Sequence, residues 1–403
     1  MFFKLKLTML CVSLSAVCAQ TGGWQLISRD IGGGPLGVSF FADGLNGVTA
    51  TSQILPAGFE TKQSKDGGYT WATVPDQDAF IFGLSNSAAG SNKTAVLSGD
   101  YFVQVSFDNG ANFSWATGAS AGGEIVRKIF DNDTTTSTGF SIIGISNDGT
   151  NGFVYSREPG GKWTSVNIPW SSPSTLSIDG SFGVNAWTIV GNVYITSAAA
   201  APAVKVKGAV ARNRARVAAR SAKATASLSS TSTAATYNTE VVISTDQGLN
   251  FKTVYANKSI AALGIACIDA LHCVIVGEDA DFAYVHTTTD GWVTVRETLA
   301  DLNEGAALVE VAVAVGVCSN GGDAFVAVGG YVTGAGQSPV WYRSCDLGVT
   351  WAKDAAPAWP VGGLLNTDID CVTTTTVNGT ECWTTLWDDS GIDPNGFVSR
   401  YFK

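Results

Sequence analysis

Six copies of one short turn constrain the fold of this chain more than any other feature. The pattern is Ser/Thr-x-Asp-x-Gly-x-x-aromatic, and its acidic position is occupied by Asp66, Asp108, Glu158, Asp246, Asp290 and Asp346. A carboxylate in such a turn accepts hydrogen bonds from nearby backbone N–H groups, and the glycine adopts a positive φ without steric cost. The aromatic side chain packs against the adjoining sheet. These turns are therefore a folding device first, and Glu158 and Trp292 are departures from the ideal pattern that the fold must tolerate.

The spacing of the turns predicts the architecture. The acidic positions are separated by 42, 50, 88, 44 and 56 residues, and each turn follows short runs rich in Val, Thr and aromatic residues that Gly, Asn and Asp interrupt. Helical periodicity is nearly absent. Periods of this length suit one blade of four antiparallel strands, so the sequence predicts an all-β chain folded as a β-propeller.

A seventh repeat lacks only its turn. Residues 381–387 and 396–400 repeat the second and third strands of the earlier copies, and the chain ends at residue 403. Residues 24–28, which begin with Trp24, supply the missing outer strand. We therefore predict one seven-bladed propeller over residues 20–403, in which the N-terminal strand completes the C-terminal blade and removes exposed sheet edges.

The first 19 residues are typical of a secretory signal. Lys4 and Lys6 precede an apolar run, and Val17-Cys18-Ala19 offers a small-residue cleavage site. No other stretch approaches the ~18 continuous apolar residues that a membrane span needs. We expect a secreted or extracellular protein that is soluble or held peripherally, with the cell surface as one location.

Cysteine and asparagine usage agree with export. Removal of the signal leaves Cys267, Cys273, Cys318, Cys345, Cys371 and Cys382. Cys267 and Cys273 flank a short turn, and Cys371 and Cys382 flank a longer one. If each of these pairs forms a disulfide, Cys318 is left to pair with Cys345. Six cysteines permit fifteen pairings, so this one is a hypothesis. Five Asn-x-Ser/Thr sequons are candidate glycosylation sites: Asn92, Asn112, Asn132, Asn257 and Asn378.

One low-complexity segment, residues 198–235, interrupts the repeat pattern. It consists mostly of Ala, Val, Ser and Thr with seven cations and no acid, namely Lys205, Lys207, Arg212, Arg214, Arg216, Arg220 and Lys223. We expect it in the loop between the second and third strands of its blade. This loop lies on the face opposite the Ser/Thr-x-Asp turns, which we call the Asp turns. One hypothesis is that it binds an acidic partner, either a protein or an anionic glycan; the alternative is a tolerated loop expansion without a role.

The remainder of the chain is acidic. Without this insertion and the signal, 15 basic residues stand against 34 acidic ones. The net negative charge of this part of the chain repels nucleic acid and anionic membranes electrostatically. We therefore expect neither as a partner, and we expect a monomer.

The repeat resembles the Asp-box, or bacterial neuraminidase repeat, propellers, which include sialidases, sortilin-type receptors and xyloglucanases. Residues 38–50, followed by the turn Asp66-Gly67-Gly68-Tyr69-Thr70-Trp71, are most similar to one repeat of the photosystem II assembly factor family. The resemblance covers the whole mature chain and implies the fold. It implies no single function, because propellers with this turn do unrelated things.

Two glycosidase alternatives can be compared with the sequence by asking whether it contains the residues that each enzyme needs. A sialidase needs an arginine cluster, but only Arg29, Arg127, Arg157, Arg296, Arg343 and Arg400 lie outside the insertion, and no Arg-Ile-Pro motif occurs. A xyloglucanase-like enzyme needs two carboxylates. Acidic residues are plentiful, but no spacing selects a pair among Glu124, Asp131, Asp133, Glu278, Asp279, Asp281, Asp368, Asp370, Asp388 and Asp389.

No cofactor or metal site is predicted. His272 and His286 are the only histidines and form no metal-binding motif, and residues 131–133 begin like a calcium loop but lack its glycine and its distal glutamate. We predict no catalytic residues. The sequence favours a secreted, non-catalytic propeller that binds protein or glycan, with a secreted glycoside hydrolase and a photosystem II assembly factor-like protein as alternatives.

Overall fold

The fold is seen in a computed structural model of the 403-residue chain. The structure describes residues 23–29, 31–53, 58–74, 81–86, 95–99, 102–115, 125–131, 140–145, 152–157, 163–171, 174–182, 186–195, 236–246, 248–257, 260–278, 283–298, 306–333, 336–355, 364–374, 379–388 and 395–402. The regular secondary structure of these residues is entirely β-strand, as the sequence predicts.

The strands form seven antiparallel sheets of four strands each. Sheet 1 contains β2 (Gly34–Phe40), β3 (Gly47–Gln53), β4 (Gly58–Ser64) and β5 (Ala72–Thr73); sheet 2 contains β6 (Ile81–Asn86), β7 (Ala95–Gly99), β8 (Phe102–Ser106) and β9 (Ser114–Trp115). Sheet 3 contains β10 (Ile125–Asp131), β11 (Phe140–Ile145), β12 (Gly152–Arg157) and β13 (Trp163–Asn167); sheet 4 contains β14 (Ser174–Phe182), β15 (Trp187–Ile195), β16 (Thr236–Ser244) and β17 (Lys252–Asn257). Sheet 5 contains β18 (Ala261–Cys267), β19 (Cys273–Glu278), β20 (Ala283–Thr288) and β21 (Arg296–Thr298); sheet 6 contains β22 (Ala306–Ala314), β23 (Ala324–Thr333), β24 (Gly336–Ser344) and β25 (Ala352–Lys353). Sheet 7 contains β26 (Leu364–Thr374), β27 (Gly379–Asp388), β28 (Asn395–Phe402) and β1 (Gly23–Arg29).

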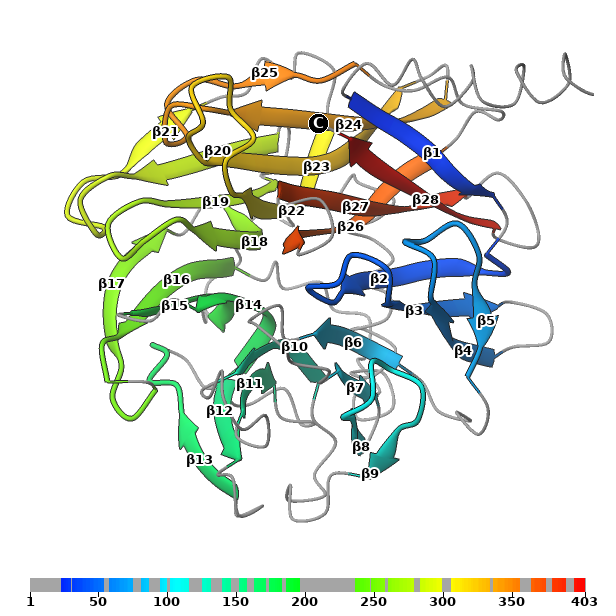
Figure 1. The fold of residues 1–403 in the computed structure, drawn as a ribbon. Coiled ribbons are helices and arrows are strands. Elements are labelled where there is room, and N and C mark those ends of the chain that lie inside the picture. Colours follow the sequence, from blue (N-terminus) through cyan, green and yellow to red (C-terminus); the bar gives the residue numbers. More distant parts are fainter. Residues whose placement is uncertain are drawn as a thin grey trace, which may run out of the picture.

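The first strand of each sheet lies innermost, and these strands follow one another around a ring (Figure 1). Successive inner strands contact each other from β2 through β6, β10, β14, β18 and β22 to β26, and β26 contacts β2. In every inner strand the pairing with the second strand shifts by one residue near the start of the strand. A β-bulge at this position bends a strand and increases its twist, so the seven bulges give the inner strands a common shape.

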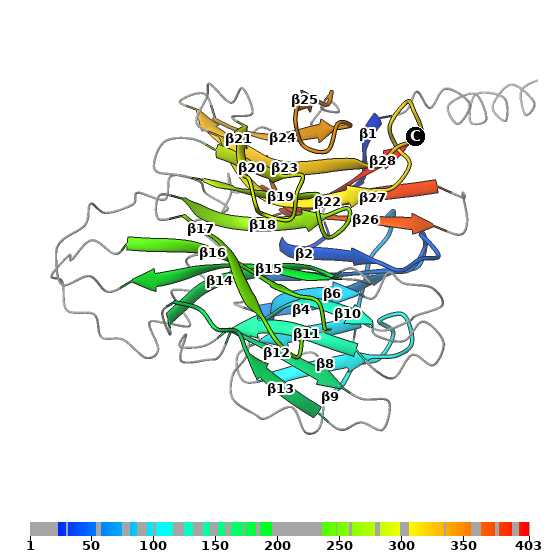
Figure 2. The same ribbon diagram turned by 90° about the vertical axis from the view of Figure 1, so that its left-hand side faces the viewer.

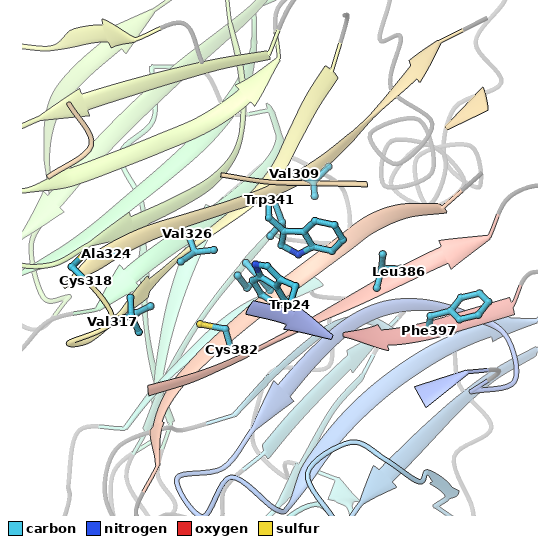
Figure 3. Packing of buried hydrophobic residues seen from close by; sticks show 13 residues of the cluster. Trp24, Val309, Val317, Cys318, Ala324, Val326, Trp341, Cys382, Leu386 and Phe397 are labelled. Carbon is cyan, nitrogen blue, oxygen red and sulfur yellow. The ribbon is translucent and has the colours of Figure 1, made fainter. Parts of the chain in front are cut away.

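Sheet 7 joins the two ends of the described chain. β1 pairs antiparallel with β28, with Trp24 opposite Tyr401 and Gln25 opposite Arg400. Trp24 is buried and stacks on Trp341 of sheet 6 with ring centroids 5.5 Å apart. Figure 3 shows Trp24 and Trp341 packed together in a core that also contains Leu386 and Phe397 of sheet 7.

The strand order defines two faces of the ring. Because the strands alternate in direction, the first-to-second and third-to-fourth turns of every sheet lie on one face, which we call the turn face. The second-to-third connections and the links between sheets lie on the opposite face. In Figure 2, β26 points toward the turn face on the right and β15 toward the opposite face on the left.

Three disulfides reinforce the turn face of sheets 5, 6 and 7. They join Cys267 to Cys273, Cys318 to Cys345, and Cys371 to Cys382, which is the pairing inferred from the sequence. The first and third occupy equivalent positions, because each links directly opposed residues of a first and a second strand. Among the described residues, no helix has the length and apolarity to cross a membrane.

We expect Trp24→Ala to destabilise the ring. The substitution leaves a cavity against Trp341 and Tyr401, and loss of a buried tryptophan costs about 3–5 kcal/mol of unfolding free energy. Urea unfolding at neutral pH measures the effect. The control is Val293→Ala, at a side chain 82% exposed, where a change within about 0.5 kcal/mol is expected; equal effects of the two substitutions contradict a special role for Trp24.

Candidate functional site

The turns singled out by the sequence have one hydrogen-bonding plan. In the turn from Ser244, the hydroxyl Oγ donates to Asp246 Oδ1 (2.7 Å), and the N–H of Gly248 donates to Oγ (2.8 Å). The Asn250 backbone N–H and side-chain Nδ2 donate to the two Asp246 oxygens at 2.9 and 2.7 Å. The same plan recurs in the turns around Asp66, Asp108, Asp290 and Asp346. Glu158 lies outside the described residues.

These hydrogen bonds stabilise the ionised carboxylate. The bonds from Asn250 lower the pKa of Asp246 to about 2. At Asp66, Asp108 and Asp346, partial burial alone would raise the pKa, but the hydrogen bonds outweigh it and the pKa is lowered. A carboxylate that accepts three such bonds maintains the turn and is poorly placed to exchange protons with a substrate, which supports the structural interpretation.

The fifth turn shows why the glycine position tolerates exchange. Trp292 takes this position with φ 73°, close to the 83° of Gly248, and its N–H still donates to Thr288 Oγ1 (2.8 Å). Its buried ring packs against Tyr255 of sheet 4 with centroids 5.6 Å apart. The packing of the indole compensates for the left-handed backbone that a side chain disfavours.

We expect Asp246→Asn to lower the melting temperature at neutral pH and to lose this effect in acid. The folded pKa of Asp246 is below the ordinary value of 3.8, so its ionised form contributes stability above pH 3.8, and this contribution disappears as the pH falls through about 2. The melting temperatures of the wild type and of Asp246→Asn between pH 2 and 7 measure this contribution. Thr245→Ala, in an exposed part of the same turn, is the control; a difference between wild type and Asp246→Asn that is independent of pH contradicts the assignment.

The opposite face contains the attachment point of the insertion. Residues 196–235 connect β15 to β16, the second and third strands of sheet 4, where the sequence places them. The two strands pair along nine positions, from Trp187 opposite Ser244 to Ile195 opposite Thr236. The seven cations of the insertion lie outside the described residues. The structure thus locates the base of the candidate binding segment but not its side chains.

A buried carboxylate lies beside this base. Glu240 is 1% exposed and accepts hydrogen bonds from the Ser171 backbone N–H (2.9 Å), the Ser171 hydroxyl and Asn238 Nδ2 (2.6 Å). Ser171 belongs to the link between sheets 3 and 4, so Glu240 attaches this link to the sheet that carries the insertion. Sequence reasoning missed Glu240, because nothing in the pattern around it indicates burial.

Carboxylates of the inner strands bond the next sheet. Asp368 and Asp370 of β26 accept the Val38 and Phe40 N–H groups of β2 at 3.0 and 2.6 Å. In the same way, Asp179 of β14 accepts the Ile265 N–H of β18 at 2.7 Å. These N–H groups are on the strand edge that faces the ring axis, where no further strand pairs with them. Asp368 and Asp370, candidates for a catalytic pair, therefore have a structural function.

The other acidic candidates are dispersed. Asp388 is the last residue of β27 and is largely buried, and Asp131 and Glu278 are the last residues of β10 and β19. Glu124, Asp133, Asp279, Asp281 and Asp389 lie outside the described residues. The described part of the chain contains no group of three His, Cys, Asp or Glu side chains arranged to bind a metal.

Two of the six arginines outside the insertion are part of the packing. Arg343 donates to Asp354 Oδ1 (2.8 Å) and to the Tyr401 hydroxyl (2.7 Å), which joins sheet 6 to sheet 7. Burial raises the pKa of Asp354, although Arg343 opposes the shift. Arg400 pairs with Glu381 and lies 5.0 Å from the centre of the Trp383 ring.

The buried histidine joins two sheets. His286 of β20 is 3% exposed, and its Nδ1 is 2.7 Å from the Tyr255 hydroxyl of β17. Burial lowers the pKa of His286, and Glu297, its cross-strand neighbour on β21, opposes the shift. The second histidine, His272, is partly exposed and pairs with Asp269 at 2.9 Å. Both histidines thus have a partner within the fold.

We expect acid to weaken the fold through His286. Its folded pKa lies below the ordinary 6.5, so as the pH falls below 6.5 the unfolded chain binds a proton that the folded chain does not, and stability decreases. His286→Gln should remove this component of the pH dependence between pH 7 and 5, and His272→Gln should retain it. Urea unfolding at each pH measures the slope; an unchanged slope in His286→Gln would falsify the assignment.

Two of the five sequons lie in the described residues. Asn112 is exposed in the second Asp turn, and its Nδ2 donates to Asp108 (2.7 Å). Asn257 ends β17, and its Nδ2 donates to the Tyr255 hydroxyl (3.0 Å). Asn92, Asn132 and Asn378 lie outside the described residues, in the first-to-second-strand connections of sheets 2, 3 and 7.

The fold is that of known β-propellers. YCF48 bound to a D1 peptide matches with a TM-score of 0.54 at 13% identity over 95% of this chain and 98% of that chain. YCF48 from Cyanidioschyzon merolae matches with a TM-score of 0.54 at 14% identity over 94% and 98%, respectively. An ancestral GH74 enzyme matches with a TM-score of 0.56 at 12% identity, over 93% of this chain and 47% of that one.

The comparisons confirm the predicted resemblance to β-propellers at the level of the fold, with YCF48 among the neighbours. At these identities the likeness shows the fold alone. No protein-family model matches the chain. No curated protein sequence matches it either.

Proposed function

We propose that this chain is a closed seven-bladed propeller that acts as a secreted, non-catalytic binding module. The seven sheets are its blades, residues 20–403 form one domain, and β1 closes the ring within the last blade. The pairing of β1 with β28 and the contact of β26 with β2 support the closure. The observation that carries the function is the position of the basic insertion on the face opposite the Asp turns.

Secretion rests on the signal at residues 1–19 and on the disulfides. Three bonds in one chain suit an oxidising compartment, because cytosolic thiols are kept reduced. The signal lies outside the described residues. Localisation of a tagged copy tests the proposal, and plastid fluorescence would favour a photosystem II assembly role instead.

The partner is an acidic protein surface or an anionic glycan. The insertion contributes seven cations and no acid, whereas most of the chain is acidic. Clustered cations attract anions over about a Debye length, and the flanking Ala and Val residues allow apolar contact. A propeller of this fold also binds a peptide, since YCF48 has been solved with a D1 peptide. A rigid ring that displays a variable loop is a suitable scaffold for such binding.

We expect the insertion to determine retention on immobilised heparin and poly-glutamate. Substitution of all seven cations of residues 205–223 by Gln should lower the NaCl concentration needed for elution to that of an uncharged reference protein, because the remaining surface is acidic. The control substitutes four exposed cations elsewhere, K65Q/K252Q/R296Q/K353Q, and should elute like wild type. Equal elution of both variants contradicts the assignment of binding to the insertion.

A glycoside hydrolase is the second candidate, favoured only by the likeness to the GH74 enzyme. The structural functions of Asp368 and Asp370 count against it. Assays on sialosides and β-glucans separate the two proposals, and turnover of any of these substrates would replace the binding proposal by an enzymatic one.

A further inference from the structure

The turn face has a repeated chemistry that the binding proposal does not use. Its eight described turns each present one carboxylate and one large apolar side chain that is exposed. The pairs are Asp43 with Leu45, Asp66 with Tyr69, Asp108 with Phe107, Asp246 with Leu249, Asp269 with Leu271, Asp290 with Val293, Asp323 with Val315, and Asp346 with Leu347. Every large apolar side chain that is exposed in the described part of the chain belongs to this set.

Within a sheet, the two turns are held together. The N–H of Gly291 donates to the carbonyl of Leu271 (3.1 Å) in sheet 5, and the Cys318–Cys345 disulfide joins the two turns of sheet 6. The apolar side chains of neighbouring turns are therefore displayed on a rigid support. A preorganised array of this kind loses little conformational entropy when it binds.

Five of these turns, on the adjacent sheets 4, 5 and 6, form what we call the turn arc. Their described residues include five carboxylates (Asp246, Asp269, Asp290, Asp323 and Asp346) and no lysine or arginine, and His272 is paired with Asp269. No sequon falls in these turns, whereas Asn112 lies in a turn of sheet 2; Asn92, Asn132 and Asn378 belong to the first-to-second-strand connections of sheets 2, 3 and 7, outside the described residues. The arc is acidic, apolar and not a glycosylation target.

We propose that the turn arc binds the basic insertion of a second copy of this chain. The inference rests on the proposed function, because it names the acidic partner of that insertion. Residues 204–223 combine Val and Ala with Lys and Arg, as in Val204-Lys205-Val206-Lys207, and so offer the complement of turns that present apolar groups beside carboxylates. The two surfaces lie on opposite faces of one ring, so the contact is head-to-tail and can extend beyond two copies.

The two surfaces of one copy lie a strand length apart, because the nine-residue strand β16 spans about 30 Å from the opposite face to the turn face. A second copy can place its insertion on the turn arc directly, without a path around the edge of the ring. Contact of the insertion with its own ring is the alternative outcome, and a monomer at every concentration would indicate it.

Sedimentation velocity of the intact protein over a concentration series tests the proposal. In 50 mM NaCl we expect reversible association, and in 500 mM NaCl monomers, because salt screens the contact. Two variants should each raise the dissociation constant at least about tenfold: the seven-Gln insertion variant, and L249N/V293T/L347N, which leaves the Ser/Thr and Asp positions of the turns intact. Asn is chosen at position 347 because Leu347 has φ 61°, which Asn tolerates.

A mixture of the two variants distinguishes a head-to-tail contact from other modes. Each variant retains one half of the contact, so the mixture should form 1:1 dimers that grow no further. Melting temperatures within about 2 °C of wild type show that both variants are folded, since 1 kcal/mol shifts a large domain by a few degrees.

Three results overturn the inference: a wild-type monomer at every concentration in 50 mM NaCl, association unaffected by the L249N/V293T/L347N substitutions, or no dimers in the mixture. If the wild type is monomeric but the seven-Gln variant still loses retention on heparin and poly-glutamate, the proposed function stands and only the self-contact fails. If the seven-Gln variant elutes like wild type from both resins, the proposed function itself fails.

Discussion

The pairing of β1 with β28 is the constraint on which the ring depends. Without it, sheet 7 would end at β28 and expose a long strand edge, and Trp341 and Tyr401 would lose their contact with Trp24. The contact is supported in three ways: Trp24 stacks on Trp341, its Nε1 donates to Asp354, and Arg343 joins Asp354 to Tyr401. Residues from the two ends of the described chain and from sheet 6 thus form one cluster. In the closed ring proposed above, this contact removes the free edge that sheet 7 would otherwise have.

Carboxylates recur in the polar contacts that hold the described residues together. On the turn face they close the Asp turns, on the inner strands they bond the free N–H groups of the following sheet, and beside the insertion Glu240 attaches a link between sheets. Each carboxylate oxygen can accept more than one hydrogen bond, so these positions gain from being acidic. The acidic composition therefore reflects architecture as much as surface charge.

The two faces of the ring differ in chemistry. The turn face is braced by three disulfides and displays carboxylates beside exposed apolar groups, whereas the opposite face carries a single basic insertion in an otherwise acidic molecule. A partner that approaches either face meets a different combination of charge and apolar surface. The proposed binding function and the proposed self-contact both follow from this difference between the two faces.

The sequence by itself determined the repeat, the strand content and the place of the insertion, because these depend on local patterns: the Ser/Thr-x-Asp turn, period-two alternation and composition. It also allowed the cysteine pairing to be inferred, since Cys267 and Cys273 flank one turn. Only the tertiary structure decided which acids are buried or shared between sheets. Glu240 and Ser171 are 69 residues apart, and Asp368 and Val38 are 330 apart. No local pattern records such contacts, because they exist only once the sheets have packed around the ring. The exposure of one apolar side chain in each described turn became visible for the same reason: burial is a property of the assembled ring and not of any one repeat.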